Sequence, residues 1–227
     1  MDVFEAVDSR ISCRWFLDRP VEPTIVRDLI EKAARAASGG NLQPWRVYAL
    51  TGKPLAAIKR RAAEAIEGHD PRHDDGEYPI YPKPMGEPYK ARREEHGVQL
   101  YTALKIARDD MAARLEQYKR NFEFFNAPVG LFITIERRLG VAQWTDLGAY
   151  VATLMYLARG YGLDTCPQES WARIYTTVGE FLNLPPDHML FCGVALGYGD
   201  RSHPANSFRS TRAELKDFCT FLGFDAG

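Results

Sequence analysis

Apolar residues recur every three or four positions in several stretches of the chain, and this spacing predicts amphipathic helices. The first strong helix is expected over residues 23–37, because Pro23 suits a first helical turn and apolar residues share one face after it. Residues 143–161 are apolar on most sides, which is typical of a helix buried in a core or in a subunit interface. The same periodicity predicts further helices over residues 2–9, 53–66, 89–120, 175–182 and 213–221.

Shorter apolar runs predict strands over residues 45–50, 129–135 and 189–196. The run at 129–135 is apolar on both faces, as expected for a central strand that helices cover on each side. Residues 67–88 are rich in proline and glycine and predict a long irregular excursion, a kind of loop that is more often functional than idle. No linker divides the chain, so a single domain over residues 1–227 is expected, with a helical segment at 89–127 after the excursion.

Composition narrows the classes of function. A chain of 227 residues with 45% apolar residues can bury a sizeable core, and its net charge of −1 offers no electrostatic reason to expect nucleic acid or a membrane surface as partner. The first residues lack the pattern of a signal peptide, and no stretch reaches the roughly 18 apolar residues of a membrane span. The four cysteines are far apart and predict reduced, mostly buried thiols in a cytoplasmic protein.

The stretch from Ser38 to Trp45 lies between a predicted helix and a predicted strand and is unusually rich in groups that could contact a ligand. Its two glycines allow a close approach of the backbone, and Asn41 and Gln43 each carry an amide that both donates and accepts. Pro44 ends any continuing helix. Taken alone, the segment fits either a simple connection or a ligand-binding loop.

Basic residues near both ends of the chain are candidate phosphate ligands. Arg10, Ser12 and Arg14 alternate, so in an extended segment two guanidinium groups and a hydroxyl point to the same side. Arg209 and Arg212 form a second pair near the far end. Either pair could be solvated surface arginines, and a single phosphate site requires that the two ends of the chain meet in space.

Other familiar chemistry is not expected. Pro71 interrupts the cluster of histidines and aspartates at residues 69–75, which is therefore interpreted as a solvated loop rather than a metal site. The glycines at 193–199 follow a strand but precede no helix, which excludes a Rossmann fingerprint. Without a nucleophile motif or a metal site, the chain is better equipped to hold a phosphate-bearing cofactor that performs redox chemistry.

An aromatic cluster precedes the central strand and has two interpretations. Phe122, Phe124 and Phe125 belong either to the core or to a pocket in which a flat aromatic substrate stacks.

Four motifs in order resemble the flavin-dependent nitroreductase superfamily. They are Arg10-x-Ser12-x-Arg14, Ser38-x-x-Asn41-x-Gln43-Pro44-Trp45, Gly162-Leu163-x-x-x-Pro167-Gln168-Glu169-Ser170, and Ala195-Leu196-Gly197-Tyr198 followed by Arg209-x-x-Arg212. The stretch from Pro88-Tyr89 through Arg120-Asn121-Phe122 to Ala127-Pro128-Val129-Gly130 resembles the subgroup of 4-nitrobenzoate and dinitroaniline-type reductases. The resemblance spans nearly the whole chain.

The resemblance implies an α+β sandwich, with a central mixed, mainly antiparallel sheet wrapped by helices, in an intertwined homodimer that holds two FMN molecules at its interface. Arg10, Ser12 and one or both of Arg209 and Arg212 would bind the FMN phosphate, and Arg14 would lie nearer the ribityl chain or the pyrimidine. Ile11 stands where many members have a basic residue, and it could contribute its backbone. Ser38 and Asn41 would reach the flavin of the other subunit, although Ala37 stands where many members have proline. Pro167, Gln168 and Glu169 would follow the flavin ring, with a backbone N–H near Glu169 donating to N5.

The function implied is a two-electron ping-pong oxidoreductase that takes electrons from NADPH or NADH and passes them to a nitroaromatic or quinone, with no catalytic side chain of its own. Three alternatives stay open. A reductive dehalogenase and a flavin-destroying enzyme share the scaffold, and a flavin-binding sensor or carrier would bind FMN without fast turnover.

Overall fold

A four-stranded sheet lies at the centre of the computed structural model, which describes residues 1–224. Its strands are β1 (Arg46–Thr51), β2 (Val129–Glu136), β3 (Asp164–Gln168) and β4 (His188–Gly197). They lie in the order β1-β2-β4-β3, and each neighbouring pair is antiparallel. A parallel bridge between Ser12 and Thr165 adds a short contact at the β3 edge. The expected mixed, mainly antiparallel sheet within an α+β fold is confirmed.

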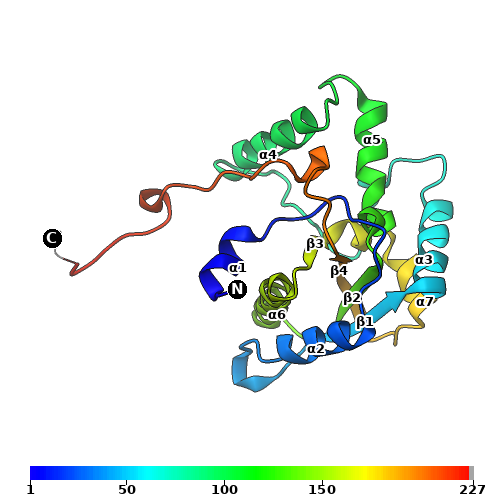
Figure 1. Cartoon of the computed structure of the whole chain (residues 1–227), viewed down its shortest axis with the longest axis horizontal. Coiled ribbons are helices and arrows are strands. Elements are labelled where there is room, and N and C mark those ends of the chain that lie inside the picture. Colours follow the sequence, from blue (N-terminus) through cyan, green and yellow to red (C-terminus); the bar gives the residue numbers. More distant parts are fainter. Residues whose placement is uncertain (225–227) are drawn as a thin grey trace.

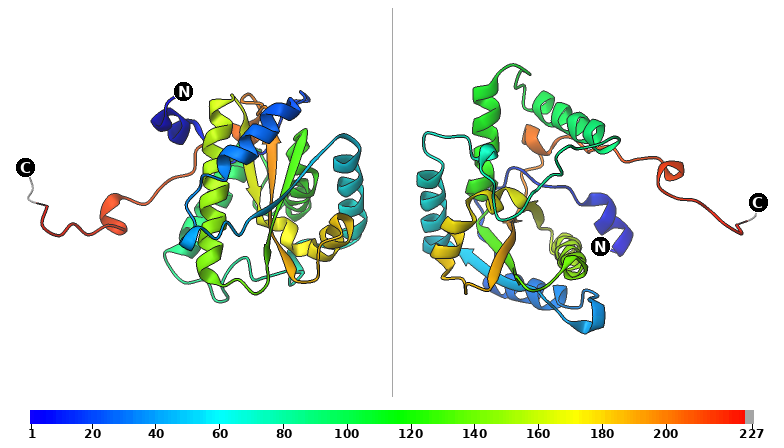
Figure 2. Two further views of the ribbon diagram at one scale, coloured as in Figure 1. Left: turned by 90° about the horizontal axis from the view of Figure 1, so that it is seen from below. Right: turned by 180° about the vertical axis from the view of Figure 1, so that it is seen from behind.

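Helices cover both faces of this sheet, as Figures 1 and 2 show. On one face lie α2 (Pro23–Ala33) and the long α6 (Val141–Gly160), and on the other lie α3 (Gly52–Ala65) and α7 (Tyr175–Leu182). The remaining helices are α1 (Val3–Ser9), α4 (Tyr89–Ala103) and α5 (Met111–Lys119). α4 and α5 stand to one side of the sheet, and the C-terminal segment passes beside α4 before it leaves the body of the molecule (Figure 1).

The alternation of side chains along β2 divides the core in two. Leu131, Ile133 and Ile135 are fully buried and pack toward α2 and α6. Phe132 points the other way and packs with Trp171 between the sheet and α3. Fully burying an aliphatic or aromatic side chain contributes about 1.5–3 kcal/mol, so both layers supply a large share of the folding free energy.

Two expected elements are interrupted or shortened in the structure. The helix expected over residues 89–120 is two helices, because Lys105 adopts a left-handed backbone (φ 57°) and the Asp110 side chain caps a new helix by accepting from the Ala113 N–H at 2.9 Å. The helix expected over residues 23–37 ends at Ala33.

Two further elements differ in kind. Residues 164–168 lie outside the strands expected from the apolar runs, yet they form strand β3 by pairing with β4. Their sequence contains no apolar run that would predict this pairing. The helix expected over residues 213–221 is a single turn at Leu215–Asp217, because this segment extends away from the body of the molecule and leaves Phe218, Phe221 and Leu222 exposed (Figure 1). Helical propensity without a packing partner stabilises a short segment too little.

Glu77 and Tyr78 anchor the excursion at 67–88 to the body of the molecule. The Glu77 N–H donates to the carbonyl of Ala172 at 2.8 Å, and the buried Glu77 carboxylate accepts from Arg137 Nη1 at 2.7 Å. Next to it, the Tyr78 hydroxyl donates to the carbonyl of Phe191, the residue that bulges out of the β2–β4 register. The bulge therefore provides a free carbonyl that ties the excursion to the sheet.

No helix among residues 1–224 is long and apolar enough to cross a membrane.

Close packing at Gly130 provides a test of this architecture. A methyl group added there would lie 2.7 Å from the ring of Phe124 and 2.9 Å from Leu55 Cδ1. Gly130→Ala is therefore expected to lower the free energy of unfolding by about 1–3 kcal/mol in denaturant titrations. Gly179→Ala is the control, because Gly179 lies within α7 and a methyl group added there would meet no neighbouring atom within 4 Å. This substitution should stabilise the protein by about 0.5–1 kcal/mol. Equal effects of the two substitutions would contradict the packing described here.

Candidate functional site

The extended segment that follows α1 forms hydrogen bonds with strand β3 on one side and with the chain after β4 on the other. The Cys13 N–H donates to the Thr165 carbonyl of β3 at 2.9 Å, and the Arg14 N–H donates to Asn206 Oδ1 at 2.7 Å. Cys13 points into the core and is fully buried, and burial raises the pKa of its thiol to about 12. The alternate residues Arg10, Ser12 and Arg14 therefore share the opposite side, as the spacing predicts.

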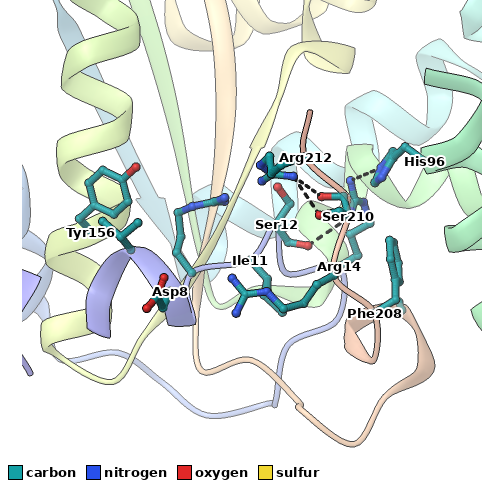
Figure 3. Close-up of a pocket in the computed structure, with 13 residues that line it drawn as sticks. Asp8, Ile11, Ser12, Arg14, His96, Tyr156, Phe208, Ser210 and Arg212 are labelled. Carbon is teal, nitrogen blue, oxygen red and sulfur yellow. Dashed lines mark hydrogen bonds between the residues drawn. The ribbon is translucent and has the colours of Figure 1, made fainter. Parts of the chain in front are cut away.

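These three residues line a cavity of about 460 Å³ to which both ends of the chain contribute (Figure 3). Arg209 and Arg212 enter it from the C-terminal segment, so the two arginine pairs do belong to one site. The further lining residues are Val7, Asp8, Ile11, His96, Tyr156, Ala205, Phe208 and Ser210.

The cavity has a strong excess of positive charge. Four guanidinium groups line it against the single carboxylate of Asp8, and within residues 1–224 none of the four forms an ion pair. Arg14 Nη1 donates to the Ser12 carbonyl at 3.2 Å, and Arg212 Nη1 donates to the Ser210 carbonyl and hydroxyl at 3.0 and 2.9 Å. Guanidinium forks match the oxygens of a phosphate, so this set of donors fits a phosphate group.

Asn206 joins the two ends of the chain, and sequence reasoning missed it. Its buried side chain accepts from the Arg14 N–H and donates through Nδ2 to the carbonyls of Trp15 at 2.9 Å and Asp200 at 2.7 Å. The side chain of Asn206 thus bonds only to backbone groups, which belong to the N-terminal segment and to the chain after β4. A lone asparagine in a polar tail carries no sequence signal of such a role.

A buried ion pair fixes α1 and thereby the start of the cavity. Arg159 on α6 donates through Nη1 to Asp164 Oδ1 at 3.0 Å and through Nε to Ser9 Oγ at 3.1 Å. Asp164 is 3% exposed, and Arg201 pairs with the same oxygen. Burial raises the pKa of the Asp164 carboxyl, and the two guanidinium groups oppose that shift. The network places Ser9, the neighbour of Arg10, against the end of α6.

Pro167, Gln168 and Glu169 are not part of the cavity lining in this chain. Gln168 is buried and donates through Nε2 to the Asn121 carbonyl at 2.7 Å. Glu169 is exposed at the start of the turn that follows β3. The strand leads from Thr165, which pairs with the arginine segment, toward these residues, so their contact with a ligand stays a prediction.

Ser38 and Asn41 lie on a separate loop that is anchored to α6. The Gly39 N–H donates to Asp146 Oδ1 at 3.1 Å, and the Gln43 N–H donates to Ser38 Oγ at 3.1 Å. Asn41 is exposed in the left-handed region (φ 57°), which asparagine tolerates better than most residues. Neither Ser38 nor Asn41 lines the cavity of this chain.

The aromatic cluster belongs to the core. Phe122, Phe124 and Phe125 are at most 2% exposed, and Phe122 and Phe124 pack against Trp171 at centroid distances of 5.4 and 4.7 Å. Left-handed backbone at Phe124 and Phe125 turns both side chains inward. Of the two interpretations, this burial favours the core, because rings so enclosed within the chain leave no face for a substrate.

His96 is a second residue of the cavity that sequence reasoning missed. It lies on α4, in a run of charged residues that resembles an ordinary solvated helix face. In the structure its Nε2 is 3.2 Å from Arg14 Nη2, and its ring packs against Phe208 at a centroid distance of 5.8 Å (Figure 3).

Residues 7–198 match the model of the nitroreductase family, so the chain belongs to that family. A nitrobenzene nitroreductase from Ectopseudomonas oleovorans is 39% identical over 218 residues, which are 96% of each chain. A 4-nitrobenzoate reductase from Pseudomonas putida is 38% identical over 99% of this chain and 97% of its own length. Among solved structures, the FMN and NADPH-dependent nitroreductase NfnB from sphigopyxis sp. strain HMH superposes with a TM-score of 0.94 at 39% identity, covering 99% of this chain and 100% of that one.

Proposed function

We propose that the protein is a single-domain, FMN-dependent NAD(P)H oxidoreductase that reduces nitroaromatic compounds. The observation that carries the proposal is the cavity in which Arg10, Ser12 and Arg14 meet Arg209 and Arg212, within a chain of the nitroreductase family. Its unpaired guanidinium groups fit the phosphate of FMN, and the volume of about 460 Å³ lies in the range of cofactor pockets.

Each part of the flavin would have its own residues. Arg10, Ser12, the Ile11 backbone and one or both of Arg209 and Arg212 would hold the phosphate, and Arg14 would reach the ribityl chain or the pyrimidine. Pro167, Gln168 and Glu169 would follow the ring, with a backbone N–H near Glu169 directed at N5. When bound, the flavin would supply two-electron redox chemistry, with NAD(P)H and the aromatic oxidant as alternate partners. The protein would bind and orient these reactants and stabilise negative charge with its donors.

The names of the relatives support the choice of substrate and electron donor. The similar proteins include reductases of nitrobenzene and 4-nitrobenzoate, and a second NfnB, from Mycobacterium smegmatis, was solved in complex with NADPH. That structure is 25% identical and superposes with a TM-score of 0.89. Quinones are a further substrate class that could accept electrons by the same two-electron chemistry.

The free, mostly buried cysteines support a cytoplasmic location.

We also propose that the working unit is a homodimer. The segment after Arg212 leaves the body of the molecule (Figure 1) and exposes Phe218, Phe221 and Leu222 at 69%, 56% and 82%. Large apolar side chains gathered on one segment favour burial against a partner. The buried Asp146 Oδ2 beside the Ser38–Asn41 loop has no hydrogen-bond partner within the described chain. The second subunit would cover the tail and bring this loop to the flavin.

The redox function is tested with purified protein. It should be yellow, and NAD(P)H should bleach the flavin absorbance within the turnover time in a stopped-flow instrument, after which 4-nitrobenzoate should restore it. Slow bleaching would favour a flavin-binding sensor or carrier. Progressive loss of the flavin would favour a flavin-destroying enzyme, and preferred turnover of a halotyrosine would favour a dehalogenase. A colourless protein that gains no flavin absorbance with added FMN would contradict the proposal.

Arg10→Ala tests the phosphate site. Loss of a charge-assisted hydrogen bond is expected to weaken FMN binding by about 1.5–3 kcal/mol in calorimetric titrations of the flavin-free protein. Binding of riboflavin, which lacks the phosphate, should change little. Arg138→Ala is the control, because Arg138 is 81% exposed and lies outside the cavity. An unchanged FMN affinity would remove Arg10 from the site.

Sedimentation equilibrium tests the dimer. The wild-type protein should have twice the 25.7 kDa mass of the chain, and the triple variant Phe218→Ser, Phe221→Ser, Leu222→Ser should dissociate at a higher concentration and lose FMN with it. Met111→Ser is the control, because Met111 is 57% exposed on α5. A monomer that retains FMN fully would refute this proposal.

A further inference from the structure

His96 lines the arginine-rich cavity, and its contact with Arg14 determines whether the imidazole is protonated and which nitrogen carries the proton. A guanidinium group only donates hydrogen bonds, so the Nε2 atom, 3.2 Å from Arg14 Nη2, must be an acceptor. The imidazole is then neutral in the ligand-free protein and carries its proton on Nδ1. A protonated ring would place an N–H against the N–H groups of Arg14 and add a like charge to the cluster.

The surroundings of His96 favour the same neutral state. Burial lowers the pKa of His96, and the charges of Arg14 and Arg212 lower it further. The charged groups that line the same cavity are Arg10 and Arg14 on the N-terminal segment, Asp8 on α1, and Arg209 and Arg212 on the C-terminal segment. Glu95 precedes His96 on α4, and its Oε1 accepts from Thr211 Oγ1 at 2.9 Å. Arginines outnumber carboxylates around the ring, so the electrostatic potential there is positive.

We propose that His96 is a proton-accepting residue of the phosphate site, which is neutral in the ligand-free protein and takes up one proton from solvent when a phosphate monoester dianion enters the cavity. This inference depends on the proposed function, because FMN is the ligand that would bring the phosphate. The two negative charges of the dianion offset the arginine charges and lie close to the ring, so they favour the protonated imidazole and raise its pKa relative to the free protein. Arg14 then turns its donors from the imidazole to the bound ligand, and the protonated imidazole becomes a donor to the phosphate oxygens.

The direction of the pH dependence follows from this change. The pKa of His96 is lowered in the free protein and raised in the complex, so binding takes up a proton at any pH between the two values. FMN affinity therefore increases as pH falls through that window, with a limit of about tenfold per pH unit for one linked proton. Riboflavin brings no phosphate and shows no such dependence.

Calorimetry in buffers of different ionisation enthalpy measures the proton directly. At pH 7.5 the phosphate of free FMN is mostly dianionic, since its second pKa is about 6, so the ligand has few protons to release when it binds as the dianion. Titrating flavin-free wild-type protein with FMN should show a net uptake of up to one proton per site, and titration with riboflavin should show much less. His96→Gln keeps an acceptor for Arg14 but cannot be protonated, so its uptake should fall to the riboflavin level. His69→Gln, which alters a histidine of the 67–88 excursion that contacts Asp74 and lies outside the cavity lining, should behave like the wild type.

Each outcome has a distinct meaning. Equal proton uptake by the wild type and His96→Gln, or equal weakening of FMN and riboflavin binding in that variant, would show that His96 only supports the fold. If the wild type binds neither flavin, the proposed function fails and this inference with it. If His96→Gln does not fold, nuclear magnetic resonance of the wild type decides, because the ring should titrate below its ordinary value of 6.5 without FMN and above it in the complex. A titration that FMN does not shift would overturn the proposal.

Discussion

The extended segment that carries Arg10, Ser12 and Arg14 is useful only because two other segments hydrogen-bond to its backbone. On one side the Cys13 N–H binds the Thr165 carbonyl, and on the other the Leu17 N–H binds the Tyr198 carbonyl at 2.8 Å. The Asp200 N–H returns a bond to the Trp15 carbonyl at 3.1 Å. An isolated extended segment would fray in water. Pairing with β3 and with the chain after β4 instead fixes which side chains face the cavity, and so it determines the whole site.

Local patterns predicted the parts of this arrangement but not the contact between them. The alternation of arginines placed three side chains on one side once the segment was extended, and the apolar run at 129–135 identified the central strand. The meeting of Arg10 with Arg212 depends on Asn206, whose bond to Arg14 spans 192 residues of sequence. No periodicity within either segment encodes such a contact. His96 was missed for the same reason, because only the tertiary structure brings α4 over the cavity.

The misassigned elements show where packing overrides local sequence. Residues 164–168 contain aspartate and proline, which are depleted in strands, yet pairing with β4 makes them a strand. The aromatic residues at 122–125 suggested a stacking surface, but Gly130 and Trp171 leave a space that these rings fill. In both cases the deciding information lies on a neighbouring strand, which the local sequence does not contain.

The assembly of the cavity from both ends of the chain also constrains its biosynthesis. The ribosome delivers Arg10 long before Arg209 and Arg212, so a nascent chain cannot complete the guanidinium cluster until the segment after β4 has emerged. The sheet, by contrast, is finished at Gly197 and can form earlier. The cavity is therefore completed after the strands of the core are available. A chain that ended shortly after β4 would keep its four strands and would lack the two arginines of the C-terminal segment.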